Sequence, residues 1–173
     1  MDAWLVPDSM RRFLITVSVG MVVSIQPANA SINESTPLAS IHYQQFAAKA
    51  FIYDPRSLRW KATKNGKVIR SGRGSGGSNY CRDVKRACRT PTGTFRMIGK
   101  RGVNCRSSRY PLGKGGAPMP YCMFFSKYYA IHGSPDVPNY NASHGCIRVK
   151  PHDARWLYHQ FMEIGTKVVV KPY

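Results

Sequence analysis

The sequence predicts a mostly β fold, a sandwich or barrel, with one amphipathic helix near the C-terminus. After residue 50 the chain divides into short segments rich in aromatic and β-branched residues, separated by Gly, Pro, Asn and Ser. One later stretch instead repeats apolar residues at intervals of three and four, which is typical of a helix. With 173 residues, 43% of them hydrophobic, the chain can bury one sizeable core. We therefore expect one folded domain with short appendages.

The first thirty residues have the pattern of an export signal. Arg11 and Arg12 precede an apolar run over residues 13–25, and residues 28–30 (Ala-Asn-Ala) match a small-x-small cleavage site. The alternative is a membrane anchor, but the run is shorter than the roughly 20 residues that a spanning helix needs. We expect residues 1–30 to be a signal peptide, with no stable membrane span after its removal.

The next segments predict a linker and then a β-hairpin. Residues 31–49 are polar with scattered apolar positions and are expected to form a linker or a short N-terminal helix. Asn65-Gly66 lies between two extended segments, and a tight type I′ turn needs positive φ at both central residues. Residues 70–80 are rich in Gly and Ser without apolar spacing, so we expect a loop there.

The predicted helix lies close to the C-terminus. Its apolar stripe runs from about residue 153 to 163, and Gly165 ends the pattern. Three consecutive valines then predict a buried closing strand. In chain order, the expected strands are residues 51–53, 59–64, 67–71, 94–100, 121–125, 128–132 and 167–171.

The formal net charge of +18 belongs to the chain beyond residue 30, because Asp2 and Asp8 offset Arg11 and Arg12. A surface this basic attracts anions. Because the chain carries an export pattern, we expect anionic envelope polymers as candidate partners and no nucleic acid. The alternative is a solvated basic face without one particular partner. Charge alone favours adhesion to anionic surfaces and indicates nothing about a catalysed reaction.

Five cysteines leave one unpaired if the others oxidise outside the cytoplasm. Four cysteines allow three pairings, so the connectivity stays open at this stage. The most local solution joins Cys81 to Cys88 and Cys105 to Cys122. That solution leaves Cys146 as the free thiol.

Cys146 lies in a stretch that suits a catalytic cysteine, which needs a base, a group that orients the base, and amide donors for oxyanion charge. His132 ends a predicted strand far enough upstream for a loop to bring the two side chains face to face. Gly133 and Gly145 permit close backbone approaches. The amides of His144, Gly145 and Cys146 are expected to face a substrate oxygen. Because an imidazolium lowers a thiol pKa, we expect an ion pair in the resting state.

Metal binding is the alternative for the same region. Four side chains there are of the kind that bind zinc: His132, His144, Cys146 and His152. Their spacing lacks the paired ligands that share one turn, so we expect no metal and no cofactor. His42 and His159 are interpreted as surface or packing residues, His159 without a visible partner.

The segment IHGSPDVPNYNASHGCIRV, residues 131–149, resembles the active-site signature of the L,D-transpeptidases of bacterial cell walls, the YkuD-type family. KNGKVIRSGRGSGG resembles the early hairpin of that family, TPTGTF its turn-and-strand element, MPYCMFF its substrate-cleft strand and GTKVVV its closing strand. The resemblance covers most of residues 50–173 and implies that they form an L,D-transpeptidase catalytic domain.

The resemblance implies a role for each matching residue. Cys146 is expected to be the nucleophile, His132 the general base, and Gly133 the backbone group that orients this histidine. His144 and Gly145 are expected to line the oxyanion region.

Other positions of the motif are less closely defined by the resemblance. Ser143 completes the oxyanion and orienting set. Arg148 is expected to brace the catalytic loop or to hold a substrate carboxylate, with bracing favoured. Tyr121 is a candidate substrate contact. The insert over residues 71–89 is longer and more basic than the family needs, and we interpret it as a stapled surface loop, with a cleft-shaping lid as the alternative.

The activity that the resemblance implies is that of an exported cysteine acyltransferase in the periplasm or cell envelope, with roles in cell wall biogenesis and cell shape. It would act on peptidoglycan tetrapeptide stems through a thioester on Cys146. The acceptor stays open: a second stem for cross-linking, a D-amino acid for exchange, a protein lysine for attachment, or water, which would make the enzyme an L,D-carboxypeptidase. The alternative from another class is a non-catalytic basic protein for wall binding or adhesion. A papain-like peptidase is disfavoured because the histidine precedes the cysteine.

Overall fold

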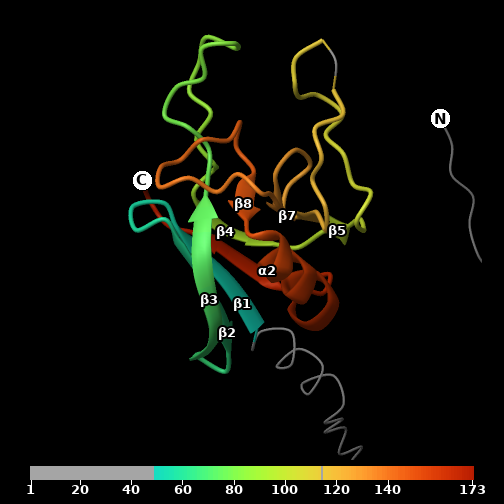
Figure 1. The fold of residues 1–173 in the computed structure, drawn as a ribbon. Helices are drawn as coiled ribbons and strands as arrows, with labels where there is room; N and C mark the ends of the chain where they lie inside the picture. The colour runs from blue at the N-terminus through green and yellow to red at the C-terminus, as the bar shows by residue number, and fades with distance from the viewer. Residues whose placement is uncertain (1–48, 114) are drawn as a thin grey trace, which may run out of the picture. The chain divides into compact units, whose positions relative to one another are not determined.

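The computed structural model describes residues 49–113 and 115–173, which form one curled, mixed β-sheet and a helix (Figure 1). The predicted mostly β class is confirmed, and the sheet curls into a half-barrel. The predicted signal peptide and nearly all of the predicted linker lie outside the described residues. The strands are β1 (Lys49–Asp54), β2 (Arg59–Lys64), β3 (Lys67–Ser75), β4 (Gly93–Arg96), β5 (Gly99–Lys100), β6 (Met123–Phe124), β7 (Ala130–Gly133), β8 (Ile147–Val149) and β9 (Lys167–Val170).

The strands follow the order β4-β9-β1-β2-β3-β8-β7-β6-β5 across the sheet. The β2–β3 hairpin turns at Asn65 and Gly66, whose φ angles are 51° and 76°, so the predicted turn is confirmed. Residues 94–100 form two strands rather than the one predicted, because β4 pairs with β9 while β5 pairs with β6.

β3 is longer than predicted, and the expectation of a loop from residue 70 is wrong for its first part. A Cβ on Gly72 would lie 2.8 Å from Nε1 of Trp60, and one on Gly74 would lie 2.9 Å from the Tyr53 ring. Glycine therefore lets this strand pass close to two buried aromatic side chains. Beyond that contact, β3 leaves β2 and pairs with β8, so it joins the two halves of the sheet.

The helical segment begins at Pro151, slightly before the predicted start, and consists of α2 (Pro151–Trp156) and the wider turns of η1 (Leu157–Phe161). Proline suits the first helical position, where an amide has no intrahelical partner. The predicted apolar stripe enters the core through Ala154, Leu157 and Phe161. No helix among residues 49–113 and 115–173 is long and apolar enough to cross a membrane.

The loop after β3 and the loop after β5 extend on the same side of the sheet, close to the ends of β7 and β8 (Figure 1). Each contains a disulfide: Cys81 pairs with Cys88, and Cys105 with Cys122. The structure thus has the local pairing that the spacing favours, and Cys146 is the free cysteine.

Candidate active site

β7 and β8 bring His132 and Cys146 to one face of the sheet. The two strands are parallel, with Ile131 opposite Ile147 and His132 opposite Arg148. Ile131 and Ile147 point into the core, so their sequence neighbours point to the other face. Cys146 immediately precedes β8, and continuing this register places it diagonal to His132. The strand pairing therefore brings together two candidate catalytic residues that are fourteen positions apart in the sequence.

The His132 imidazole is buried, and its position defines its tautomer. Nδ1 donates a hydrogen bond to the carbonyl oxygen of Gly133 at 2.9 Å. A carbonyl only accepts, so Nδ1 carries the proton and Nε2 keeps its lone pair. Burial lowers the pKa of His132 to about 4, while the Gly133 carbonyl opposes this shift and the Arg148 charge reinforces it. The imidazole is neutral at pH 7 and able to accept a proton.

Cys146 is half-buried as a residue and packs against the cluster formed by Ala130 and the second disulfide. Burial raises the pKa of its thiol, although the Ala130 backbone amide and the Arg148 charge act in the opposite direction. The two shifts favour a neutral thiol beside a neutral imidazole. Both directions run against the resting ion pair expected from the sequence.

Residues 143–146, the catalytic turn, are closed by the Ser143 hydroxyl. This hydroxyl donates to the Cys146 carbonyl and accepts from the Gly145 amide at 3.0 Å. The Gly145 amide is thus engaged inside the turn, contrary to the expectation that it faces a substrate. Gly145 itself has a φ of 122°, and a Cβ there would lie 2.4 Å from the Tyr129 ring. Only glycine fits this position.

The loop before the catalytic turn is anchored on β1 and on the residues that follow β3. The Tyr53 hydroxyl donates to Oδ1 of Asn141 at 2.7 Å and accepts from the Gly76 amide at 2.8 Å. The Ser143 amide donates to the Gly76 carbonyl at 2.9 Å. The Ser75 hydroxyl donates to the carbonyl of residue 140. These hydrogen bonds hold the loop and the turn against β1 and the end of β3.

Arg148 and Tyr121 each contact residues outside the catalytic turn. Nη1 of Arg148 contacts Oδ2 of Asp136 at 2.6 Å, which ties β8 to the loop after β7. Tyr121 has a φ of 58° and packs against Tyr158 and His159. His159 is thus a packing residue, one of the two interpretations given from the sequence, and the structure supplies the partners that the sequence did not show.

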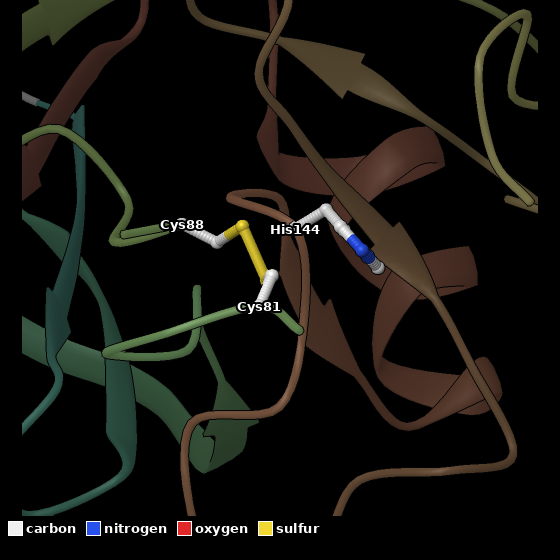
Figure 2. Close-up of side chains that lie close together, drawn as sticks. All are labelled: Cys81, Cys88 and His144. Carbon is white, nitrogen blue, oxygen red and sulfur yellow. A yellow bond between two sulfur atoms is a disulfide. The ribbon is translucent and has the colours of Figure 1, made fainter. Parts of the chain in front are cut away.

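The four candidate zinc ligands named from the sequence do not gather in the described part of the chain. His152 is exposed and lies 3.4 Å from Asp153. The group that does gather is Cys81, Cys88 and His144 (Figure 2). His42 lies outside the described residues.

The His144 side chain points away from the catalytic turn toward the two disulfide loops. Its Nε2 donates to Oδ2 of Asp83 at 2.7 Å, and the Tyr110 ring stacks on it at a centroid distance of 4.0 Å. We call Asp83 and Tyr110 the His144 clasp. The part of the insert beyond β3, residues 76–89, is thus a disulfide-stapled loop that contacts the catalytic turn.

Sequence reasoning missed the residues that hold the site from a distance. They are Tyr53, Asp83, Tyr110, Asp136 and Asn141. Tyr53, Asp83 and Tyr110 stand in no local pattern that differs from an ordinary strand or loop, whereas Asp136 and Asn141 lie inside residues 131–149 but had no role assigned to them. Covariation between such pairs across related sequences would have been the signal to find them.

Comparisons with known proteins agree with this geometry. The family model of the L,D-transpeptidase catalytic domain, YkuD, matches residues 49–170. A comparison with curated protein sequences finds no match. Among solved structures, the chain is similar to an L,D-transpeptidase from Xylanimonas cellulosilytica, with 30% identity and a TM-score of 0.62 over 71% of this chain and 60% of that chain.

Two more distant structures share the fold. An L,D-transpeptidase from Mycobacterium smegmatis has 22% identity and a TM-score of 0.60 over 72% of this chain and 59% of that chain. L,D-transpeptidase 3 from Mycobacterium tuberculosis, solved with a faropenem-derived adduct, has 19% identity and a TM-score of 0.59 over 72% of this chain and 60% of that chain. The match therefore spans about three fifths of the length of these structures. Because the family model matches most of its residues, the chain belongs to the L,D-transpeptidase catalytic domain (YkuD) family.

Proposed function

We propose that this chain is an exported cysteine L,D-transpeptidase that acts on peptidoglycan tetrapeptide stems, with residues 50–173 as its catalytic domain. The observation that carries the proposal is the β7–β8 register, which brings Cys146 and His132 to one face of the sheet. Family membership supports the same reaction class. The two disulfides support residence in the periplasm or cell envelope after removal of the signal peptide.

The reaction begins with two neutral groups. Cys146 Sγ attacks the carbonyl carbon of the third stem residue, and the thiol proton passes to Nε2 of His132 as the sulfur–carbon bond forms. The bond to the terminal D-alanine then breaks, and His132 returns the proton to the leaving amine. The product is a thioester on Cys146. An acceptor amine attacks this thioester and gives a proton to His132. The sulfur–carbon bond then breaks, the acyl group leaves as an amide of the acceptor, and His132 returns the proton to the Cys146 sulfur.

The turn and its neighbours have defined roles in this scheme. The Gly133 carbonyl orients His132, and Ser143 keeps the catalytic turn closed. The amides of His144 and Cys146 remain as the oxyanion donors, because the amide of Gly145 is engaged. Arg148 braces β8 through Asp136, which its short contact supports over a role in carboxylate binding.

The acceptor and the surface partners are part of the proposal. We take the acceptor to be an amine, so that the reaction forms a cross-link, exchanges a D-amino acid or attaches a protein. Water as acceptor would make the chain an L,D-carboxypeptidase. The charge of +18 supports binding to anionic envelope polymers around the stems.

Incubation with purified tetrapeptide muropeptides tests the reaction. The wild type is expected to release D-alanine and to form cross-linked or exchanged products, which chromatography and mass spectrometry identify. Cys146→Ala should lower the rate by at least about 10³, and His132→Gln by about 10². His152→Gln, an exposed imidazole, is the matched control and should keep full activity. Equal activity in Cys146→Ala and the wild type would refute the proposal.

Alkylation of the thiol separates a neutral pair from a preformed ion pair. Iodoacetamide should modify Cys146 with a rate that rises with pH and has its midpoint above the ordinary thiol pKa, because burial raises the pKa of this thiol. His132→Gln should leave this midpoint nearly unchanged, because the imidazole is uncharged at that pH. A midpoint below about 7 that moves upward in His132→Gln would instead indicate the ion pair.

A further inference from the structure

The Cys81–Cys88 disulfide and His144 form a compact group of metal-binding side chains beside the catalytic turn (Figure 2). The two sulfur atoms and one ring nitrogen lie within 4.8 Å of one another. Both cysteines are buried and His144 is partly exposed. Zinc holds thiolate sulfur at about 2.3 Å and imidazole nitrogen at about 2.0 Å. Ligand atoms at this separation can close on one ion once the sulfur–sulfur bond is absent.

Backbone contacts hold this group together independently of the sulfur atoms. The Cys81 amide donates to the Arg86 carbonyl at 2.9 Å, and the Cys88 amide donates to the Ser78 carbonyl at 3.1 Å. The Ser78 amide in turn donates to the Ser143 carbonyl at 2.8 Å. Because no sulfur takes part in these bonds, we expect the loop to keep its place against the catalytic turn after reduction of the disulfide.

The His144 imidazole is held by two neighbouring side chains. Asp83 accepts from its Nε2 and Tyr110 stacks on its face. A carboxylate on the second nitrogen is the usual partner of a metal-bound histidine, and it leaves the lone pair of Nδ1 for the metal.

The loop around the two cysteines is rich in positive charge. Its exposed cations near the two cysteines in the sequence are Arg82, Lys85, Arg86 and Arg89. The thiolate is the form of cysteine that binds metal, and these cations lie close to it in the sequence. Two thiolates offset the double charge of a zinc ion, so the loaded loop gains no net charge relative to its disulfide form.

We propose that the dithiol form of Cys81 and Cys88, together with His144, binds one zinc ion. A dithiol reductant gives two electrons and two protons to the disulfide and becomes a disulfide itself. Zinc then displaces the two thiol protons and forms two zinc–sulfur bonds and one zinc–nitrogen bond, with water as the fourth ligand. This proposal goes beyond the transpeptidase reaction and does not rest on it.

The position of the zinc site links the redox state of the insert to the catalytic turn. His144 stands directly before Gly145, and Cys146 follows. Zinc would cross-link the loop in place of the disulfide. It would also bind the turn itself through His144. The site thus takes a soft divalent cation next to the nucleophile without using the nucleophile as a ligand.

Metal content and cobalt spectroscopy of the full chain test the proposal. After reduction with a phosphine and removal of the reductant without air, the wild type should take up about one zinc per chain. Cobalt at the same site should give a thiolate-to-cobalt charge-transfer band. The untreated disulfide form should give neither. Asp83→Asn should weaken zinc binding by about tenfold, since it removes the second partner of the imidazole.

Matched variants identify the ligands. Replacing both Cys81 and Cys88 by Ser should abolish uptake, and His144→Ala should weaken it at least about tenfold. Replacing both Cys105 and Cys122 by Ser removes the other disulfide and should leave uptake unchanged, as should Cys146→Ser. Uptake that survives loss of Cys81 and Cys88, or that disappears with Cys146→Ser, would overturn the proposal.

A measurement on the wild type alone tests the proposal even if the variants fail to fold. Reduced protein is treated with iodoacetamide with and without zinc, and modified cysteines are mapped by mass spectrometry. Zinc should protect Cys81 and Cys88 while Cys105 and Cys122 react at the same rate in both samples. Equal protection of all four cysteines, or of none, would contradict the site.

Discussion

The catalytic turn and the His144 clasp lie side by side but are built differently. The turn is closed from within, by the buried Ser143 hydroxyl and by a glycine packed against Tyr129. The clasp acts from outside, through an Asp83 side chain that is 43% exposed and a stacked Tyr110. Buried contacts of the first kind contribute strongly to the free energy of unfolding, whereas exposed contacts of the second kind contribute little. We infer that the turn positions the proposed nucleophile, Cys146. The clasp contributes to the surface next to that side chain.

The largest effect is expected from a methyl group in the turn. Gly145→Ala combines a positive φ with a contact against Tyr129, and we expect a loss of about 4 kcal/mol in unfolding free energy. Urea titration measures it. Gly99→Ala is the control, because a Cβ there meets nothing within 4 Å, and its effect should stay below about 1 kcal/mol. Similar losses in both variants would show that the turn is not tightly packed.

The pH dependence of stability tests the burial of His132. Its native pKa of about 4 lies below the ordinary value of 6.5, so between these values the unfolded chain binds a proton that the native protein does not. Stability should therefore fall as pH falls through this window, by about 3 kcal/mol in total. His132→Gln should remove this part of the pH dependence. Identical profiles for the two proteins would contradict a buried neutral imidazole.

The same linkage has the opposite direction for Cys146. Burial raises its native pKa, so at alkaline pH the unfolded chain releases a proton that the native protein keeps. Stability should fall as pH rises above the ordinary thiol pKa, and Cys146→Ala should lose this decline. An alkaline profile that is unchanged in the variant would argue against a buried thiol.

Removing the hydroxyl of the turn should have an intermediate effect. Ser143→Ala leaves the Cys146 carbonyl and the Gly145 amide without their buried partner, and we expect a loss of about 2 kcal/mol. Ser57→Ala, in the exposed turn between β1 and β2, should change stability by less than about 0.5 kcal/mol. A loss in Ser143→Ala no larger than in this control would place the hydroxyl outside the turn's hydrogen bonds.

The smallest effect on stability is expected from the clasp. Tyr110→Ala removes one stacked ring from His144 and should cost about 1 kcal/mol, whereas Tyr110→Phe should cost less. The informative readout is NMR of the His144 ring, whose signals should shift and broaden while the Gly145 amide stays in place. Movement of the Gly145 amide signal as well would show that turn and clasp are one unit.

The difference between the two regions also explains what the sequence can predict. The Asn65-Gly66 turn is a local preference for positive φ, and residues 131–149 hold the proposed nucleophile, the proposed base and both glycines in one stretch. Such short-range patterns are visible in a single sequence. The local disulfide pairing was predictable for the same reason.

Contacts between distant residues were not predictable from the sequence. The second half of β3 has no apolar pattern, because its glycines are required by the rings of Trp60 on β2 and Tyr53 on β1. The neutral state of His132 and Cys146 depends on how completely the surrounding strands bury them. Asp83 reaches His144 only because a stapled loop folds back over the turn.

The most direct test of the central claim, that Cys146 is the nucleophile and His132 its base, is intact mass spectrometry after incubation with a penem such as faropenem. The account predicts one covalent adduct per chain, mapped to the peptide that contains Cys146, absent in Cys146→Ala and formed at least about tenfold more slowly in His132→Gln. An adduct that persists in Cys146→Ala, or a wild type that stays unmodified, would contradict it.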